Sequence, residues 1–238
     1  YNIPEFNMRV RASGGTGFNA PSLFQLYGVI GNTFRGNPNL KPEHSIGYEF
    51  GAEMDIPLFN QPRFSTIGFT FFQSRVTDLI NFNAGFNTLV NVGQANIKGV
   101  EIVYALRPFT WLTADLAWTL TSAEDAATGR QLPRRPPSVI TATARIEPIP
   151  GLVIAPQLLF TGPSPEGPFA SYTNTGASIS SQRNNKSGTI LNITASYRIT
   201  PQITGYLEAR NLTNSDWEPV NGFQIAGRSL IVGTRFAF

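Results

Sequence analysis

Apolar and polar residues alternate strictly along several stretches of the chain. Near the C-terminus, Leu230, Val232 and Phe236 fall on one face, and Ser229 and Arg235 fall on the other. The same period of two recurs about ten times, most clearly over residues 48–56, 112–120, 140–147 and 191–199. Side chains of a β-strand alternate between two faces, so this pattern predicts about ten strands, each with one apolar and one polar face.

The lengths of the segments between the predicted strands alternate as well. Long connections occupy about residues 16–43, 81–96, 122–138, 163–188 and 213–228, and short ones occupy about 57–62, 107–110, 148–151 and 200–202. Outer-membrane barrels place long extracellular loops at one end and short periplasmic turns at the other. The predicted fold class is therefore all-β: an antiparallel transmembrane β-barrel meander. A soluble all-β domain is the alternative, although it has no reason to sort its loops by length.

In such a barrel the apolar sets face lipid and the polar sets face the lumen. The expected lumen-facing residues are Glu49, Glu101, Arg145, Glu208, Arg210 and Arg235. So many charges need water or a folded plug beside them, because burying unpaired charges is prohibitively costly. A closed ten-stranded barrel would be narrow, so we expect these strands to be part of a wider barrel. The first strand, near Arg9, and the last should then be open edges.

Composition narrows the function classes. Hydrophobic residues make up 41% of the 238 residues, but no run of about 18 apolar residues exists that could form a transmembrane helix. A net charge of +3 with scattered basic residues argues against nucleic acid as a partner. The chain has no cysteine and a single histidine, His44. These counts offer no catalytic triad and no multi-histidine metal site, so we expect neither an enzyme nor a bound metal or cofactor.

Five short motifs resemble, in the same order, those of TonB-dependent outer-membrane transporters, particularly the cobalamin transporter branch. They are GFNAPSL at residues 17–23, GNPNLKPE at 36–43, NVGQANIKGVE at 91–101, ARNLTN at 209–214 and AGR at 226–228. The resemblance implies that residues 1–238 are the C-terminal part of a 22-stranded receptor barrel, without its plug domain. Residues 221–238 would correspond to the family's C-terminal box.

The resemblance also implies a function and partners. The function would be TonB-dependent import of a scarce, bulky nutrient, a cobalamin-like corrinoid or an iron-siderophore, across the bacterial outer membrane. This chain would form wall and loops in contact with outer-membrane lipid. The TonB complex would act through the missing plug, and Phe238 would be read by the barrel-assembly machinery. A passive porin-like channel is the alternative function.

The resemblance points to Arg134 as a ligand-binding residue. Cobalamin transporters have a Leu-Arg-Arg segment here, which matches Leu132 to Arg135 except for Pro133. The first arginine of that segment reaches the ligand, and a guanidinium suits ligands rich in amides and phosphates. The alternative is that Arg134 and Arg135 form structural bonds with lumen carboxylates. The extra prolines depart from the cobalamin pattern and leave the ligand open.

Aromatic residues of the long loops are further candidates for binding. Tyr27, Phe169 and Tyr172, together with Phe34 and Trp217, could stack on a bulky ligand. The alternative for all five is packing between loops or a belt at the membrane interface. Glu208 and Arg210 lie two apart on one strand, so we expect them to form an ion pair or a contact with the plug.

Overall fold

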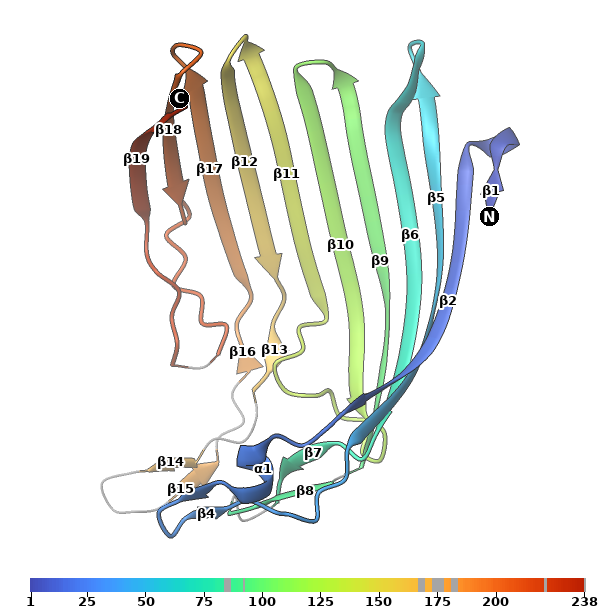
Figure 1. Cartoon of the computed structure of the whole chain (residues 1–238), viewed down its shortest axis with the longest axis vertical. Coiled ribbons are helices and arrows are strands. Elements are labelled where there is room, and N and C mark those ends of the chain that lie inside the picture. The colour runs from blue at the N-terminus through green and yellow to red at the C-terminus, as the bar shows by residue number, and fades with distance from the viewer. Residues whose placement is uncertain are drawn as a thin grey trace.

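The main feature of the computed structural model is one antiparallel sheet, in which each strand pairs with the next. The structure describes residues 1–83, 87–91, 93–166, 184–220 and 222–237, and only the backbone of 170–172 and 178–180. In these residues the sheet has eleven strands in the order β1-β2-β5-β6-β9-β10-β11-β12-β17-β18-β19 (Figure 1). The ten long strands of the described chain are β2 (Met8–Asn19), β5 (Glu43–Leu58), β6 (Gln61–Thr77), β9 (Gln94–Phe109), β10 (Leu112–Asp125), β11 (Ser138–Ile149), β12 (Leu152–Thr161), β17 (Gly188–Arg198), β18 (Ile203–Arg210) and β19 (Ser229–Phe236).

The sheet is open, as the sequence predicted. The strands β1 and β19 stand at opposite ends of the strand order, and Figure 1 shows them at opposite sides of the curved sheet. The edge of β2 is not bare along its whole length, however. The short strand β1 (Asn2–Ile3) pairs with it opposite Met8 and Arg9. The prediction of an unpaired edge at Arg9 is therefore wrong, because the turn η1 (Pro4–Phe6) folds the first residues back onto β2.

The connections are sorted by length between the two ends of the sheet, which confirms the predicted pattern (Figure 1). The short turn between β5 and β6 consists of Phe59 and Asn60, both with positive φ (50° and 62°), as a tight hairpin turn requires. The long connections carry small elements: α1 (Leu23–Tyr27), β3 (Val29–Ile30), β4 (Phe34–Arg35), β7 (Ile80–Phe82), β8 (Leu89–Asn91), β13 (Ser164–Pro165), β14 (Ala170–Tyr172), β15 (Ser178–Ser180) and β16 (Asn184–Asn185). No helix of the described residues is long and apolar enough to cross a membrane.

Several strands are longer than the alternation predicted. The strand β6 has 17 residues and β5 and β9 have 16 each, whereas a membrane strand needs about 9–11. The strand β2 continues to Asn19, so the loop expected from residue 16 begins later than predicted. The strand β6 ends at Thr77, so the loop expected from residue 81 begins earlier than predicted. Side chains alternate between apolar and polar only along the part of a strand that lies in the membrane. The backbone hydrogen bonds between strands continue beyond the membrane into water, so the strands are longer than the alternation.

Strand register places the polar and apolar sets on opposite faces. Cross-strand partners share a face, and Phe50 pairs with Phe71 while Glu53 pairs with Arg9. On the apolar face large side chains remain open: Phe50 is 53%, Phe69 47% and Leu116 38% exposed. On β5, β6 and β10 the apolar face is therefore open enough for lipid to cover it.

Candidate functional site

The long-loop end holds the tightest packing outside the sheet. One part, here called the loop cluster, consists of α1, residues 34–43 and the β7–β8 hairpin. Its buried apolar residues are Phe34, Leu40 and Leu89, which are 5–8% exposed. The ring of Phe34 stacks on Phe24 with centroids 5.3 Å apart and meets the edge of Phe82 at 5.8 Å. Phe34 is therefore a packing residue of the loops, as the alternative to ligand binding stated.

Two of the sequence motifs meet in the loop cluster. The carboxamide of Asn91 bonds both backbone groups of Lys41: Oδ1 accepts from Lys41 N at 2.8 Å, and Nδ2 donates to Lys41 O at 2.9 Å. The same Nδ2 donates to Asp78 O at 2.6 Å. Asn37 Nδ2 donates to Leu89 O at 2.9 Å. The Asn91 side chain thus acts as a strand partner for a loop 50 residues earlier in the chain.

A glycine and a helix cap fix the backbone of the same cluster. A Cβ on Gly36 would lie 2.6–2.7 Å from backbone atoms of Leu26 and Tyr27, so only glycine fits there. Ser22 and Gln25 form a reciprocal capping box at the start of α1. Tyr27, a predicted ligand contact, ends this helix and is 66% exposed. It lies on the rim of the cluster, where a bulky molecule has access to it.

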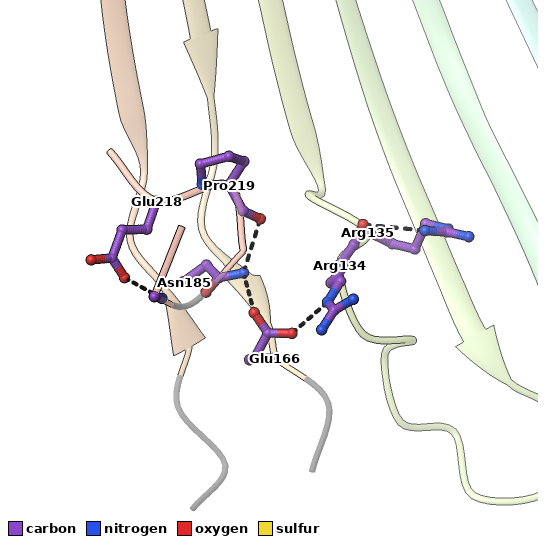
Figure 2. Close-up of polar contacts among 7 residues, drawn as sticks. Arg134, Arg135, Glu166, Asn185, Glu218 and Pro219 are labelled. Carbon is purple, nitrogen blue, oxygen red and sulfur yellow. Dashed lines mark hydrogen bonds and ion pairs between the residues drawn. The ribbon is translucent and has the colours of Figure 1, made fainter. Parts of the chain in front are cut away.

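A second network ties three long loops together around Glu166. The Glu166 side chain is fully buried, and its Oε1 accepts from Arg134 Nε at 2.6 Å. Its Oε2 accepts from Asn185 Nδ2 at 2.9 Å, and the same nitrogen donates to Pro219 O at 3.3 Å (Figure 2). Arg134 N also donates to Pro165 O at 2.8 Å. The loops before β11, before β17 and before β19 are therefore joined through the side chains of Glu166 and Asn185.

The two adjacent arginines differ in this network. Arg134 has a positive φ of 58° and directs its guanidinium to Glu166, while its side chain stays 45% exposed. Figure 2 shows Arg135 directed away from Glu166, with Nη1 donating to the carbonyl of Arg134 at 3.3 Å. The partner of Arg134 is a loop carboxylate and not a lumen one. The ligand contact of Arg134 stays a prediction.

The loop before β19 is organised by Asn211, which is 4% exposed. Its Nδ2 donates to the carbonyls of Ser215 and Ala226 at 3.0 and 2.9 Å, and its Oδ1 accepts from Ser215 N at 2.9 Å. Trp217 follows, with Nε1 donating to Lys186 O at 3.1 Å, and a Cβ on Gly188 would meet its ring. Trp217 therefore packs one loop on another.

Sequence reasoning missed Glu166 and Asn185, and it quoted Asn91 only as the first residue of a motif, without its bridging role. Glu166 and Asn185 are buried polar residues in predicted loops, and no periodicity marks them. The aromatic candidate Phe169 lies outside the described residues, as does Phe238. Of Tyr172 the structure describes only the backbone, in β14. The proposed roles of these three residues stay predictions.

The six predicted lumen residues share one face of the sheet. Cross-strand partners share a face, and the register from strand to strand therefore places five of them on the same face. These five are Glu49, Glu101, Arg145, Glu208 and Arg235, and Thr70 and Gln157 are among the partners between them. Arg210 lies two residues from Glu208 and pairs with it through two contacts, Nε to Oε1 at 2.7 Å and Nη2 to Oε2 at 3.0 Å. This confirms the predicted ion pair.

Some other charged side chains of the sheet are also paired. The ion pairs are Arg9 with Glu53, Arg63 with Asp55, Arg107 with Asp115, and Arg145 with Glu147. The described residues contain no group of three or more potential metal ligands. The exposed His44 and the half-buried Ser45 are neighbours in β5 and point to opposite faces. Of the predicted binding residues, the long-loop end thus presents Arg134 with a half-exposed guanidinium and Tyr27 with an exposed ring.

Comparison with known proteins gives one family. The family model described as "TonB dependent receptor-like, beta-barrel" matches residues 1–212. The vitamin B12 transporter BtuB of Vibrio cholerae serotype O1 is 26% identical over 239 residues, which cover 99% of this chain and 35% of that protein. The chain thus spans about a third of the length of the curated relatives it matches.

Solved structures show the same fold. The siderophore receptor PirA from Acinetobacter baumannii has a TM-score of 0.76 at 19% identity, covering 97% of this chain and 39% of that one. The copper transporter OprC has a TM-score of 0.76 at 15% identity, covering 100% and 38%. These relatives are named as transporters and receptors, and not as enzymes. Identities this low carry the fold and leave the cargo open.

Proposed function

This chain belongs to the TonB-dependent receptors, which lie in the bacterial outer membrane, and from that premise we propose that it forms wall and extracellular loops of a nutrient importer. The full receptor would import a scarce, bulky compound, with energy delivered by TonB through a plug domain. Strands from outside these residues would close the barrel. The observation that supports this most is that one end of an open, lipid-facing sheet bears long loops that hydrogen bonds join to one another.

Within this proposal the polar face lines the lumen. Part of its charge is already paired, as in Arg9 with Glu53, Arg107 with Asp115 and Arg210 with Glu208. Glu49, Glu101 and Arg235 form no ion pair within the described residues, so water or a plug would have to meet these charges. The C-terminal residue Phe238 would serve the barrel-assembly machinery during insertion.

The proposed cargo is a bulky chelate, a cobalamin-like corrinoid in the first place and an iron-siderophore in the second. The corrinoid is favoured by the similarity to a vitamin B12 transporter along 99% of the chain. Arg134 and Tyr27 would contact it, and Phe169 and Tyr172 would lie in the same set of loops. An arginine fork suits the amides and phosphate of a corrinoid.

The test is uptake by cells that carry the full-length receptor and lack their own transporters. We expect saturable uptake of radiolabelled cyanocobalamin, and loss of that uptake when TonB is deleted or the proton gradient is collapsed. Ferric siderophore serves as the second cargo in the same cells. Uptake that persists without TonB would mean a passive channel and would refute the proposal.

The role of Arg134 needs a test that separates ligand contact from loop structure. We expect Arg134→Ala to weaken surface binding of the labelled cargo by more than Arg135→Ala, the adjacent control. Glu166→Gln removes the ion pair with Arg134 but keeps the guanidinium. If Glu166→Gln weakens binding as much as Arg134→Ala, then Arg134 acts by holding the loops and does not touch the cargo.

A further inference from the structure

The lipid-facing surface changes from mostly apolar to mostly polar toward the long-loop end. The side-by-side residues of four neighbouring strands on this face are Phe50, Phe71, Val100 and Leu120. The next set toward the loops on the same face, here called the polar rung, is Tyr48, Gln73, Lys98 and Ser122. The next set toward the loops is Ile46, Arg75, Asn96 and Glu124, in which only Ile46 is apolar. The edge of the hydrocarbon layer therefore lies at about the height of the polar rung.

Tyr48 shows the same boundary within one side chain. Its ring lies against Phe71 of the apolar set, with centroids 6.3 Å apart. Its hydroxyl donates to Gln73 Oε1 in the polar rung at 2.7 Å. A tyrosine with an apolar contact below and a polar contact above is typical of a membrane interface.

Two basic side chains stand at this boundary on the lipid side. Lys98 belongs to the polar rung, and Arg75 lies in the next set toward the loops, on the strand beside it. Diagonal neighbours of this kind have Cα atoms about 7–8 Å apart, so both long side chains reach one group. Both residues are exposed, and neither forms an ion pair within the described residues. Arg75 Nη2 donates to Gln94 Oε1.

The other charged or titratable groups on this part of the face leave it positive. Asn96 of β9 lies between Glu124 of β10 and Arg75 of β6 and pairs with both. Glu124 and Arg75 are therefore two strand spacings, about 10 Å, apart. Glu124 Oε1 accepts from the Ser122 hydroxyl at 2.6 Å. His44 lies one set farther from the membrane. Two cations therefore face one carboxylate.

We propose that Arg75 and Lys98 bind a phosphate of a lipid headgroup in the outer leaflet. Basic side chains at a membrane edge attract anionic headgroups, and a guanidinium fits phosphate oxygens. A lipid is the occupant rather than free phosphate, because the apolar set directly below, with Phe71 and Val100, lies where the acyl chains of the same molecule would pack. The inference rests on the lipid-facing assignment and not on which nutrient is imported.

The test uses the purified full-length receptor in neutral detergent and the bisphosphorylated glycolipid lipid A as the probe. Binding is measured by native mass spectrometry. The double variant Arg75→Gln/Lys98→Gln should lose on the order of 30-fold in affinity, the combined effect expected for two basic residues at a membrane surface. The matched control is Arg130→Gln/Lys41→Gln, which removes the same charge from exposed loop positions and should keep the affinity of the unchanged receptor.

Two further arms separate the source of the phosphate and the state of the fold. Dephosphorylated lipid A should bind weakly to both proteins, and inorganic phosphate should not compete at millimolar concentration. Circular dichroism and cyanocobalamin uptake should be the same for both double variants. If cyanocobalamin is not the cargo, uptake is absent in both, and the comparison of their lipid affinities is unaffected. Equal affinity losses in the two double variants, or competition by inorganic phosphate, would overturn the inference.

Discussion

Leu116→Arg is the sharpest test of the lipid-facing assignment, because its neighbour in sequence provides the control. Leu116 is the middle one of five same-face residues of β10 that run from Leu112 to Leu120, and it is 38% exposed. It pairs with Tyr104 and Ala142, so it lies inside the apolar face and not at its edge. The adjacent Ala117 points to the polar face, where it pairs with Val103 and Thr141.

The expected cost of Leu116→Arg in folding free energy follows from the depth of Leu116 in the membrane. Each end of this apolar stretch lies four residues away, about 13 Å along the strand, or about 10 Å of depth at a tilt of about 40°. An arginine side chain cannot bring its charge to water over that distance at low cost. The substitution should therefore carry the midplane value of about 2–4 kcal/mol, roughly a 30- to 700-fold loss in the folding equilibrium.

The assay is reversible unfolding of the full-length receptor in phospholipid bilayers with guanidinium chloride, followed by tryptophan fluorescence. Ala117→Arg should change the free energy of unfolding by less than about 1 kcal/mol, because the lumen face meets water or a plug. Similar costs for the two variants would refute the assignment of faces. A cost for Ala117→Arg larger than that for Leu116→Arg would mean that the faces are reversed.

Three further predictions concern the loops of the full-length receptor. Gly36→Ala should open the loop cluster to protease cleavage, because its Cβ would clash with the backbone of Leu26, whereas Gly15→Ala, with nothing within 4 Å, should leave cleavage unchanged. Asn91→Ala should speed hydrogen exchange at the Lys41 amide about 5- to 150-fold, which corresponds to a loss of about 1–3 kcal/mol. The control Asn39→Ala should leave this exchange rate unchanged. An unchanged rate in Asn91→Ala would show that Asn91 does not bridge the two loops. Asn211→Ala should lower the stability of the loop before β19 by at least about 2 kcal/mol, measured by exchange at the Ser215 amide, because four side-chain bonds are lost. Asn214→Ala is the control with the same φ of 49°, so equal effects would assign the loss to backbone strain.

The loops show how little of the site follows from local pattern. Arg134 was predicted from its sequence motif, but its partner Glu166 lies 32 residues away in a loop without periodicity. The difference between Arg134 and Arg135 depends on one backbone angle, the positive φ of Arg134. Likewise Phe34 and Tyr27 are both loop aromatics in sequence, and only packing makes one a core residue and the other an exposed one.

The sequence by itself determined the strands, their order and the two faces of the sheet. Alternation is a local property: a side chain at position i fixes the face of i+2, so residues such as Glu208 and Arg235 were assigned to the polar face without coordinates. Neighbouring strands in a meander pair in chain order, because consecutive elements usually lie next to each other in space. The tertiary structure alone decided how far the strands extend into water, where loops contact one another, and which charges stand side by side. Arg75 and Lys98 show the division: each is assigned to the lipid side by its own strand, but only the register between β6 and β9 places them next to each other.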